Sequence, residues 1–225
     1  MSGERYAVYF APPHGSPLAA FAARWFSGQA WADWSQPGPA RMAELLRSPR
    51  HYGFHATLKP PFTLADGTDE PMLSAAIEEF AAAQAAFEVP ALSPQRLDRF
   101  LALMTMAPAP RLDALAADCV RAFDRFRAPP GAAELARRRA AGLSPRQEDL
   151  LQLWGYPYVC DEFRFHMTLT GPTADDEASV LLPRLQELTA GLAAQPQCID
   201  AVCLFQQPSP AQPFELRQRH AFGGS

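Results

Sequence analysis

Hydrophobic and polar positions along the chain follow two different periods, and these predict strands interleaved with helices. Short apolar runs that end at proline or a polar turn are typical of strands. Longer amphipathic stretches that begin at a capping residue or a proline are typical of helices. The expected strands cover residues 5–11, 53–59, 87–89, 97–106, 163–170, 197–206 and 214–222. The expected helices cover about 16–28, 39–47, 70–86, 110–126 and 174–193.

This order of elements favours an α+β protein with two similar lobes. We expect one domain over residues 1–225, with a first half at 1–127, a helical insertion at 128–161 and a second half at 162–225. Within the insertion, an arginine-rich helix precedes a second helix whose Ser144-x-x-Gln147 spacing predicts a capping box. In the first half, Ser93-Pro94 is the expected turn between strands 87–89 and 97–106.

One short strand motif occurs twice. Residues 52–62 read Tyr-Gly-Phe-His-Ala-Thr-Leu-Lys-Pro-Pro-Phe and align without gaps on residues 163–173, Phe-Arg-Phe-His-Met-Thr-Leu-Thr-Gly-Pro-Thr. A single His-x-Thr would carry almost no information, whereas a second copy in an equivalent context indicates an internal repeat.

Strand geometry explains the spacing, because side chains at positions i and i+2 point to the same face. His55 therefore projects beside Thr57, and His166 beside Thr168. If the two strands face each other, two imidazoles and two hydroxyls converge on one cleft. One neutral imidazole can take a proton from water while an imidazolium gives one to a leaving oxygen, and the hydroxyls can stabilise charge on a phosphate. The motif pair predicts a phosphodiester-cleaving site.

With these motifs the chain resembles the two-histidine (2H) phosphoesterase superfamily, which includes 2′,5′ RNA ligase-like proteins and cyclic phosphodiesterases. The fuller motif strings, the opening at residues 6–12 and Trp-Gly-Tyr-Pro-Tyr-Val at 154–159 are similar to a bacterial branch associated with phosphonate metabolism. The resemblance implies a bilobal α+β fold with pseudo-twofold symmetry and a central cleft.

For the chemistry, the resemblance implies that His55, Thr57, His166 and Thr168 are catalytic. It also implies hydrolysis of a small cyclic phosphodiester, either a 2′,3′-cyclic nucleotide or a ribose cyclic phosphate, linked to phosphonate metabolism. The motifs are nearly symmetric, so they leave open which histidine is the base and which the acid.

Two cations are candidate substrate-binding residues. Lys59, the only lysine, lies two residues beyond Thr57, and Arg164 lies two residues before His166, so strand parity places each on the catalytic face. The alternative for both is a solvated cation at a strand end. The aromatic residues of the first strand, including Tyr9, are candidates for stacking on a ligand, although core packing is the favoured interpretation.

Composition narrows the partners. The chain is 48% hydrophobic and 20% charged, as expected of a globular protein, and its net charge of −4 argues against binding to long nucleic acid. The densest basic patch, Arg137 to Arg139, is more typical of a solvated or ion-paired helix face. No signal-peptide pattern, apolar span or cysteine framework is present in the sequence, so we expect a cytoplasmic protein without membrane contact.

Three other functions stay open. A metallohydrolase using His166 with Cys160, Asp161 or Glu162 is disfavoured, because these residues form no compact ligand motif, and no cofactor is expected. A module that binds a nucleotide or an RNA end without chemistry is disfavoured by the two intact motifs. A 2′,5′ RNA ligase-like activity would use the same site in the reverse direction.

Overall fold

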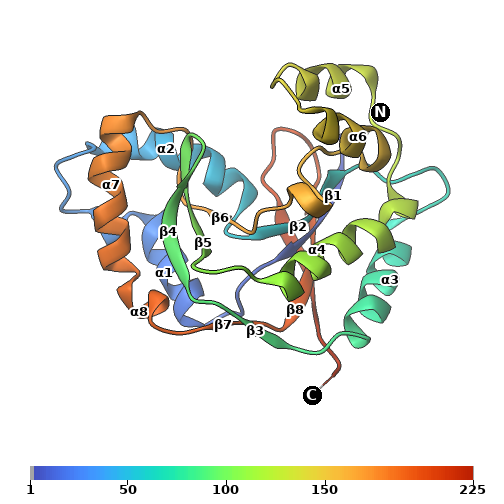
Figure 1. The fold of residues 1–225 in the computed structure, drawn as a ribbon, viewed down its shortest axis with the longest axis horizontal. Helices are drawn as coiled ribbons and strands as arrows, with labels where there is room; N and C mark the ends of the chain where they lie inside the picture. The colour runs from blue at the N-terminus through green and yellow to red at the C-terminus, as the bar shows by residue number, and fades with distance from the viewer. Residues whose placement is uncertain (1–2, 225) are drawn as a thin grey trace.

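The computed structural model describes residues 3–224, in which seven antiparallel strands form one sheet in the order β4-β5-β6-β2-β1-β8-β9 (Figure 1). These strands are β1 (Arg5–Phe10), β2 (Ala56–Phe62), β4 (Leu92–Leu97), β5 (Phe100–Thr105), β6 (Met167–Thr168), β8 (Ala201–Gln207) and β9 (Glu215–Ala221). A separate two-stranded sheet pairs β3 (Phe87–Val89) with β7 (Gln197–Ile199).

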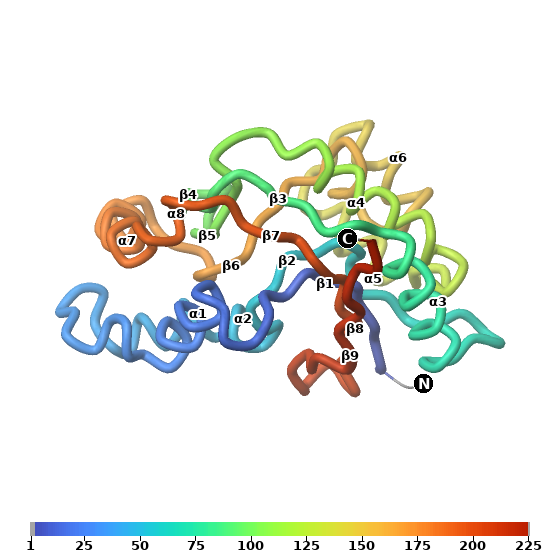
Figure 2. Tube along the Cα trace, turned by 90° about the horizontal axis from the view of Figure 1, so that it is seen from below, coloured from blue at the N-terminus to red at the C-terminus, as the bar shows by residue number. Residues whose placement is uncertain are grey.

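The helices flank the sheet at its two ends. They are α1 (Pro17–Ser27), α2 (Pro39–Tyr52), α3 (Glu70–Ala82), α4 (Pro110–Ala122), α5 (Ala132–Arg139), α6 (Pro145–Trp154), α7 (Asp175–Leu188) and α8 (Ala190–Ala193). Both views place α3, α4, α5 and α6 toward one end of the molecule and α1, α2 and α7 toward the other (Figures 1 and 2). The expected α+β class is confirmed. No helix of residues 3–224 is long and apolar enough to cross a membrane.

Strands from the two parts of the chain interleave in the sheet. The hairpin of β4 and β5 pairs with β6, and the later hairpin of β8 and β9 pairs with β1. The sheet is therefore continuous across the molecule. The expected first half supplies β4 and β5 at one end and the second half supplies β8 and β9 at the other, while strands of both halves alternate in the middle. The division of the chain at residues 127 and 162, and the two lobes, stay predictions.

The core explains how the second motif is held in place. Trp25 of α1 is fully buried, and its indole nitrogen donates a hydrogen bond of 2.9 Å to the carbonyl of Leu169. Leu169 is itself fully buried, one residue beyond β6. A buried indole needs such an acceptor, so this contact fixes α1 against the second motif as well as filling space.

The expected turn at Ser93-Pro94 is wrong. Both residues lie inside β4, which pairs with β5 from Leu92 opposite Thr105 to Leu97 opposite Phe100. Strand β4 is at the edge of the sheet. A proline there lacks an N–H group but need not break a hydrogen bond between strands, so Pro94 does not end the strand. Strand β3 pairs with β7 instead, a contact between distant segments that local signals do not encode.

Candidate active site

The two His-x-Thr motifs lie side by side at the middle of the sheet. Strands β2 and β6 are antiparallel neighbours, with Ala56 directly opposite Met167. This register places His55 across from Thr168 and Thr57 across from His166, because each step along one strand is a step back along the other. The two central residues are fully buried, so the four motif side chains project to the opposite face. The structure therefore brings all four predicted residues together.

Both imidazoles are held in the same way. His55 Nδ1 lies 3.0 Å from the carbonyl oxygen of Gly53, and His166 Nδ1 lies 2.7 Å from that of Arg164. A carbonyl only accepts, so each Nδ1 carries the proton and each Nε2 keeps its lone pair. Thr57 Oγ1 lies 3.3 Å from His55 Nε2 and donates to it. Each Nε2 is thus in the form needed to accept a proton.

Gly53 supplies the carbonyl that orients His55, and its backbone explains why glycine is needed. Its φ of 75° lies in the left-handed region, at the point where α2 ends and the chain turns toward β2. A Cβ built there would lie 3.9 Å from the Phe205 ring, an ordinary contact, so the requirement comes from the turn rather than from space.

Burial lowers the pKa of both histidines. Desolvation, with a smaller contribution from the nearby His166, lowers the pKa of His55 from 6.5 to about 4, whereas its hydrogen bond to the Gly53 carbonyl opposes the shift. Desolvation also lowers the pKa of His166, against the opposing hydrogen bond to Arg164. Both imidazoles are therefore neutral near pH 7 in the free protein, and a proton donor forms only when an anion raises one of the two pKa values.

Tyr9 positions the first imidazole. Its ring stacks on that of His55 with centroids 3.7 Å apart and an interplanar angle of 13°. Tyr9 is almost fully buried and also contacts Phe205 and Phe214, so its ring has a fixed place in the core. The favoured interpretation of Tyr9 as a core residue is confirmed, and the structure adds that its packing orients His55.

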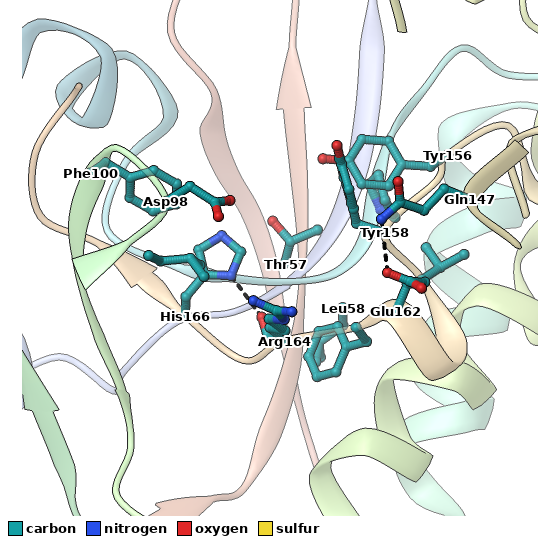
Figure 3. A pocket seen from close by; sticks show the side chains of 14 residues that line it. Thr57, Leu58, Asp98, Phe100, Gln147, Tyr156, Tyr158, Glu162, Arg164 and His166 are labelled. Carbon is teal, nitrogen blue, oxygen red and sulfur yellow. Dashed lines mark hydrogen bonds between the residues drawn. The ribbon is translucent and has the colours of Figure 1, made fainter. Parts of the chain in front are cut away.

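A first cavity, of about 440 Å³, opens beside His166; we call it the tyrosine cavity (Figure 3). It is lined by Thr57, Leu58, Pro60, Leu97, Asp98, Phe100, Gln147, Tyr156, Tyr158, Val159, Glu162, Phe163, Arg164 and His166. Two of these residues are bonded to each other: the side-chain amide of Gln147 donates a hydrogen bond of 2.9 Å to the carboxylate of Glu162. Aromatic walls with a few polar groups are typical of a site for a small ligand.

A second cavity, of about 330 Å³, lies beside His55; we call it the arginine cavity. It is lined by Arg5, Tyr9, Ser48, Pro49, Tyr52, His55, Thr57, Pro61, Arg137, Arg138, Tyr156 and Thr168. Both cavities share Thr57 and Tyr156, so they adjoin each other at the motif pair. The two histidines and two threonines of the motifs each line at least one of the cavities.

The expected placement of Lys59 on the face of the motif residues, as a substrate-binding residue, is wrong. Its side chain is 2% exposed and points into the protein, where Nζ donates to the carbonyl of Val120 at 3.1 Å and contacts Asp124 at 3.3 Å. The cause is a β-bulge. Tyr9 pairs with Thr57 while Val8 pairs with Lys59, so one extra residue in β2 reverses the alternation between the two.

Arg164 lies where strand parity predicts. It lines the tyrosine cavity with His166, and its carbonyl accepts the hydrogen bond from that imidazole (Figure 3). Its guanidinium is exposed, so it is available to an anion entering the cavity. The substrate contact itself stays a prediction.

Several lining residues were missed from the sequence. Tyr156 and Tyr158 follow α6 in the expected insertion, and Tyr52 ends α2, a helix that continues five residues beyond its expected end. The aromatic cluster just before the second motif was a visible signal, but its direction depends on tertiary packing. Among residues 3–224, no group of three or more His, Cys, Asp or Glu side chains is placed to hold a metal ion.

Comparisons with known proteins place the chain in a family. A curated relative from Janthinobacterium sp. (strain Marseille), named ribose 1,5-bisphosphate phosphokinase PhnN, is 40% identical over 231 residues, covering 98% of this chain and 51% of its own. A relative of the same name from Laribacter hongkongensis (strain HLHK9) is 33% identical over 220 residues, covering 94% and 50%. The chain thus spans about half the length of the curated relatives it matches.

A solved structure, E. coli LigT complexed with 3′-AMP, aligns over 98% of both chains with 14% sequence identity and a TM-score of 0.46. The model of the family described as "Protein of unknown function (DUF1045)" matches residues 57–215, more than half of the chain. The chain belongs to the DUF1045 family.

Proposed function

We propose that the protein is a metal-independent phosphodiesterase that hydrolyses a small cyclic phosphodiester by acid–base catalysis. The observation that carries the proposal is the pairing of Ala56 with Met167, which sets two His-x-Thr motifs across from each other with both Nδ1 protons held by carbonyl groups. The resemblance of the motifs to the 2H phosphoesterases supports the same chemistry.

The reaction requires one proton to leave water and one to reach the leaving oxygen. A neutral imidazole takes a proton from water as the water oxygen bonds to phosphorus, and the protonated imidazole on the other strand gives its proton to the ring oxygen as the P–O bond breaks. The product is a phosphomonoester with a free hydroxyl. Thr57 and Thr168 donate to the nonbridging oxygens, where negative charge increases in the transition state.

We assign the base to His55 and the acid to His166. A pKa of about 4 keeps His55 neutral across the physiological range, as a base must be. His166 lies nearer to Arg164 and the open tyrosine cavity, where a bound phosphate would raise its pKa and supply the proton.

The substrate class follows from the size and walls of the cavities. Spaces of about 440 and 330 Å³ on either side of the motifs suit a nucleoside or a phosphorylated ribose. The curated relatives are named for a ribose bisphosphate, which favours a ribose cyclic phosphate and a link to phosphonate metabolism. The only lysine of the chain, Lys59, is not in a Gly-x-x-x-x-Gly-Lys motif, so we do not extend phosphokinase activity to this chain.

The test is turnover of 2′,3′-cyclic nucleotides and ribose 1,2-cyclic phosphates in the presence of EDTA, with His55→Ala and His166→Ala as separate variants. Each substitution should lower kcat by about 10²- to 10⁴-fold, the usual contribution of a positioned proton-transfer group. His14→Ala is the matched control, because His14 is exposed outside both cavities. Full activity in either motif variant contradicts the mechanism, and tight retention of substrate without turnover favours a binding module.

A further inference from the structure

The arginine cavity presents more positive charge than one phosphodiester requires. Arg5 reaches it from β1, and Arg137 and Arg138 reach it from α5 in the expected insertion. The lining residues, all within the described part of the chain, include no aspartate or glutamate. His55 and Thr57 are in the same lining, so this positive surface adjoins the proposed catalytic pair.

We propose that this cavity binds a second phosphate on the substrate, a terminal phosphomonoester, while the scissile phosphodiester lies between His55 and His166. The inference rests on the proposed function and specifies its substrate: a sugar cyclic phosphate that also carries a phosphate at its far end. Arg5, Arg137 and Arg138 determine this specificity.

The arginines keep donors for such a group. A guanidinium has five N–H donors. Arg5 uses Nε and Nη2 on Gln207, and Arg138 uses the same two atoms on Glu134, which leaves Nη1 of each for a ligand. Arg137 is 71% exposed and reaches Glu134 only at 4.0 Å.

The same contacts hold the arginines in place before a ligand arrives. Arg138 stacks over the Tyr156 ring at 4.5 Å and Arg5 over the Phe214 ring at 5.4 Å. A site that is ordered in advance loses less entropy on binding. Within residues 3–224, Glu134 is the one carboxylate that pairs with any of these arginines, through Arg137 and Arg138, so the cluster keeps a net positive charge of about two, which matches a dianion.

The two cavities differ in a way that orients the substrate. Asp98 and Glu162 line the tyrosine cavity beside Arg164, so that side is unfavourable for a further dianion and offers acceptors to sugar or base donors. The substrate therefore places its neutral part near Tyr158 and its second phosphate among the arginines.

A phosphomonoester fits better than the next phosphodiester of an RNA chain. A monoester approaches two negative charges at neutral pH, whereas a diester carries one. The net charge of −4 on the whole protein also disfavours a long polyanion. Both groups share the same chemistry, so the experiment includes each.

The experiment compares kcat/KM for three substrates: 2′,3′-cyclic AMP, the same nucleotide with a 5′-phosphate, and a dinucleotide that ends in a 2′,3′-cyclic phosphate. Wild-type protein should prefer the 5′-phosphorylated substrate by at least 10-fold. In Arg137→Gln and Arg5→Gln that preference should fall by about 10-fold or more, because a hydrogen bond to a charged group contributes about 1.5–3 kcal/mol. Arg139→Gln is the matched control, since Arg139 is the next residue of α5, pairs with Glu148 and does not line the cavity.

Three results would overturn the inference: equal kcat/KM for the first two substrates, an equal loss in Arg139→Gln, or a preference for the dinucleotide that depends equally on Arg137. Calorimetric titration of the wild-type protein and the same variants with ribose 5-phosphate, and with ribose as control, separates this inference from the proposed function. Arginine-dependent binding without turnover of any substrate would refute the phosphodiesterase and keep the subsite. Turnover that does not depend on these arginines would support the phosphodiesterase and refute the subsite.

Discussion

His55 and His166 show how two residues of one type can differ through their surroundings alone. Each donates Nδ1–H to the carbonyl two residues before it, yet only His55 is covered by the Tyr9 ring. Burial lowers the pKa of both, to about 4 for His55. A repeated motif therefore places two imidazoles in different surroundings, and the proposed base and acid roles of His55 and His166 depend on that difference.

This difference predicts the pH dependence of catalysis. The proposed mechanism needs one neutral and one protonated imidazole, and both pKa values in the free protein lie below 6.5. The value of kcat/KM should therefore be highest below pH 6.5 and should fall about 10-fold per unit above the second pKa, since that parameter reports the free enzyme. A pH series with a cyclic phosphate checks it. A maximum above pH 7.5 would contradict the assignment, and His14→Gln should leave the profile unchanged.

Strand β2 shows how one irregularity changes the role of a residue. Regular alternation along residues 53–59 predicts that Lys59 shares the catalytic face with Thr57, and Arg164 the face with His166. The bulge between Thr57 and Lys59 reverses the first expectation and leaves the second intact. A second register shift, between Lys59 and Phe62, holds Pro60 and Pro61 inside a strand that two prolines were expected to stop.

Because Lys59 is buried, we expect its substitution to lower the stability of the protein and to leave its activity nearly unchanged. Lys59→Met should lower the free energy of unfolding by about 1–3 kcal/mol, because the Val120 carbonyl loses its donor and Asp124 keeps only Arg127 as an ion pair. The kcat/KM of the folded variant should change less than two-fold.

Arg164→Met is the matched comparison, because Arg164 is exposed in the tyrosine cavity. Its free energy of unfolding should stay within about 0.5 kcal/mol of the wild-type value, as is usual for a surface substitution. Its kcat/KM should fall. Urea denaturation and steady-state kinetics on both variants measure the two effects. The opposite pattern would restore Lys59 as a ligand of the substrate.

At the scale of the whole molecule, the depressed histidine pKa values link catalysis to stability. The unfolded chain binds a proton at each histidine near pH 6.5, whereas folded His55 does so only near 4. Between these values the unfolded state holds more protons, so folded stability is fully present above pH 6.5 and is lost as the pH falls toward 4. His55 accounts for up to about 3 kcal/mol of this loss, at 1.36 kcal/mol per pKa unit.

Unfolding by urea at pH 7.5 and pH 4.5 tests this linkage. His55→Asn should reduce the loss of stability between the two pH values, because asparagine does not titrate. His14→Asn, at an exposed position, should reproduce the wild-type loss. Carboxylates also titrate in this window, so the difference between variants is the measured quantity. An identical pH dependence in His55→Asn would show that its imidazole is not desolvated.

The sequence by itself determined the α+β class, most of the helices and strands, and the four motif residues, because alternation, capping and an internal repeat are local patterns. Only the tertiary structure decided the pairing of β3 with β7, the interleaved sheet and the burial of Lys59. It also brought Tyr156 and Arg138 from the expected insertion to the cavity beside His55. These contacts join segments far apart in the chain, and a bulge depends on the partner strand, so local periodicity carries no record of them.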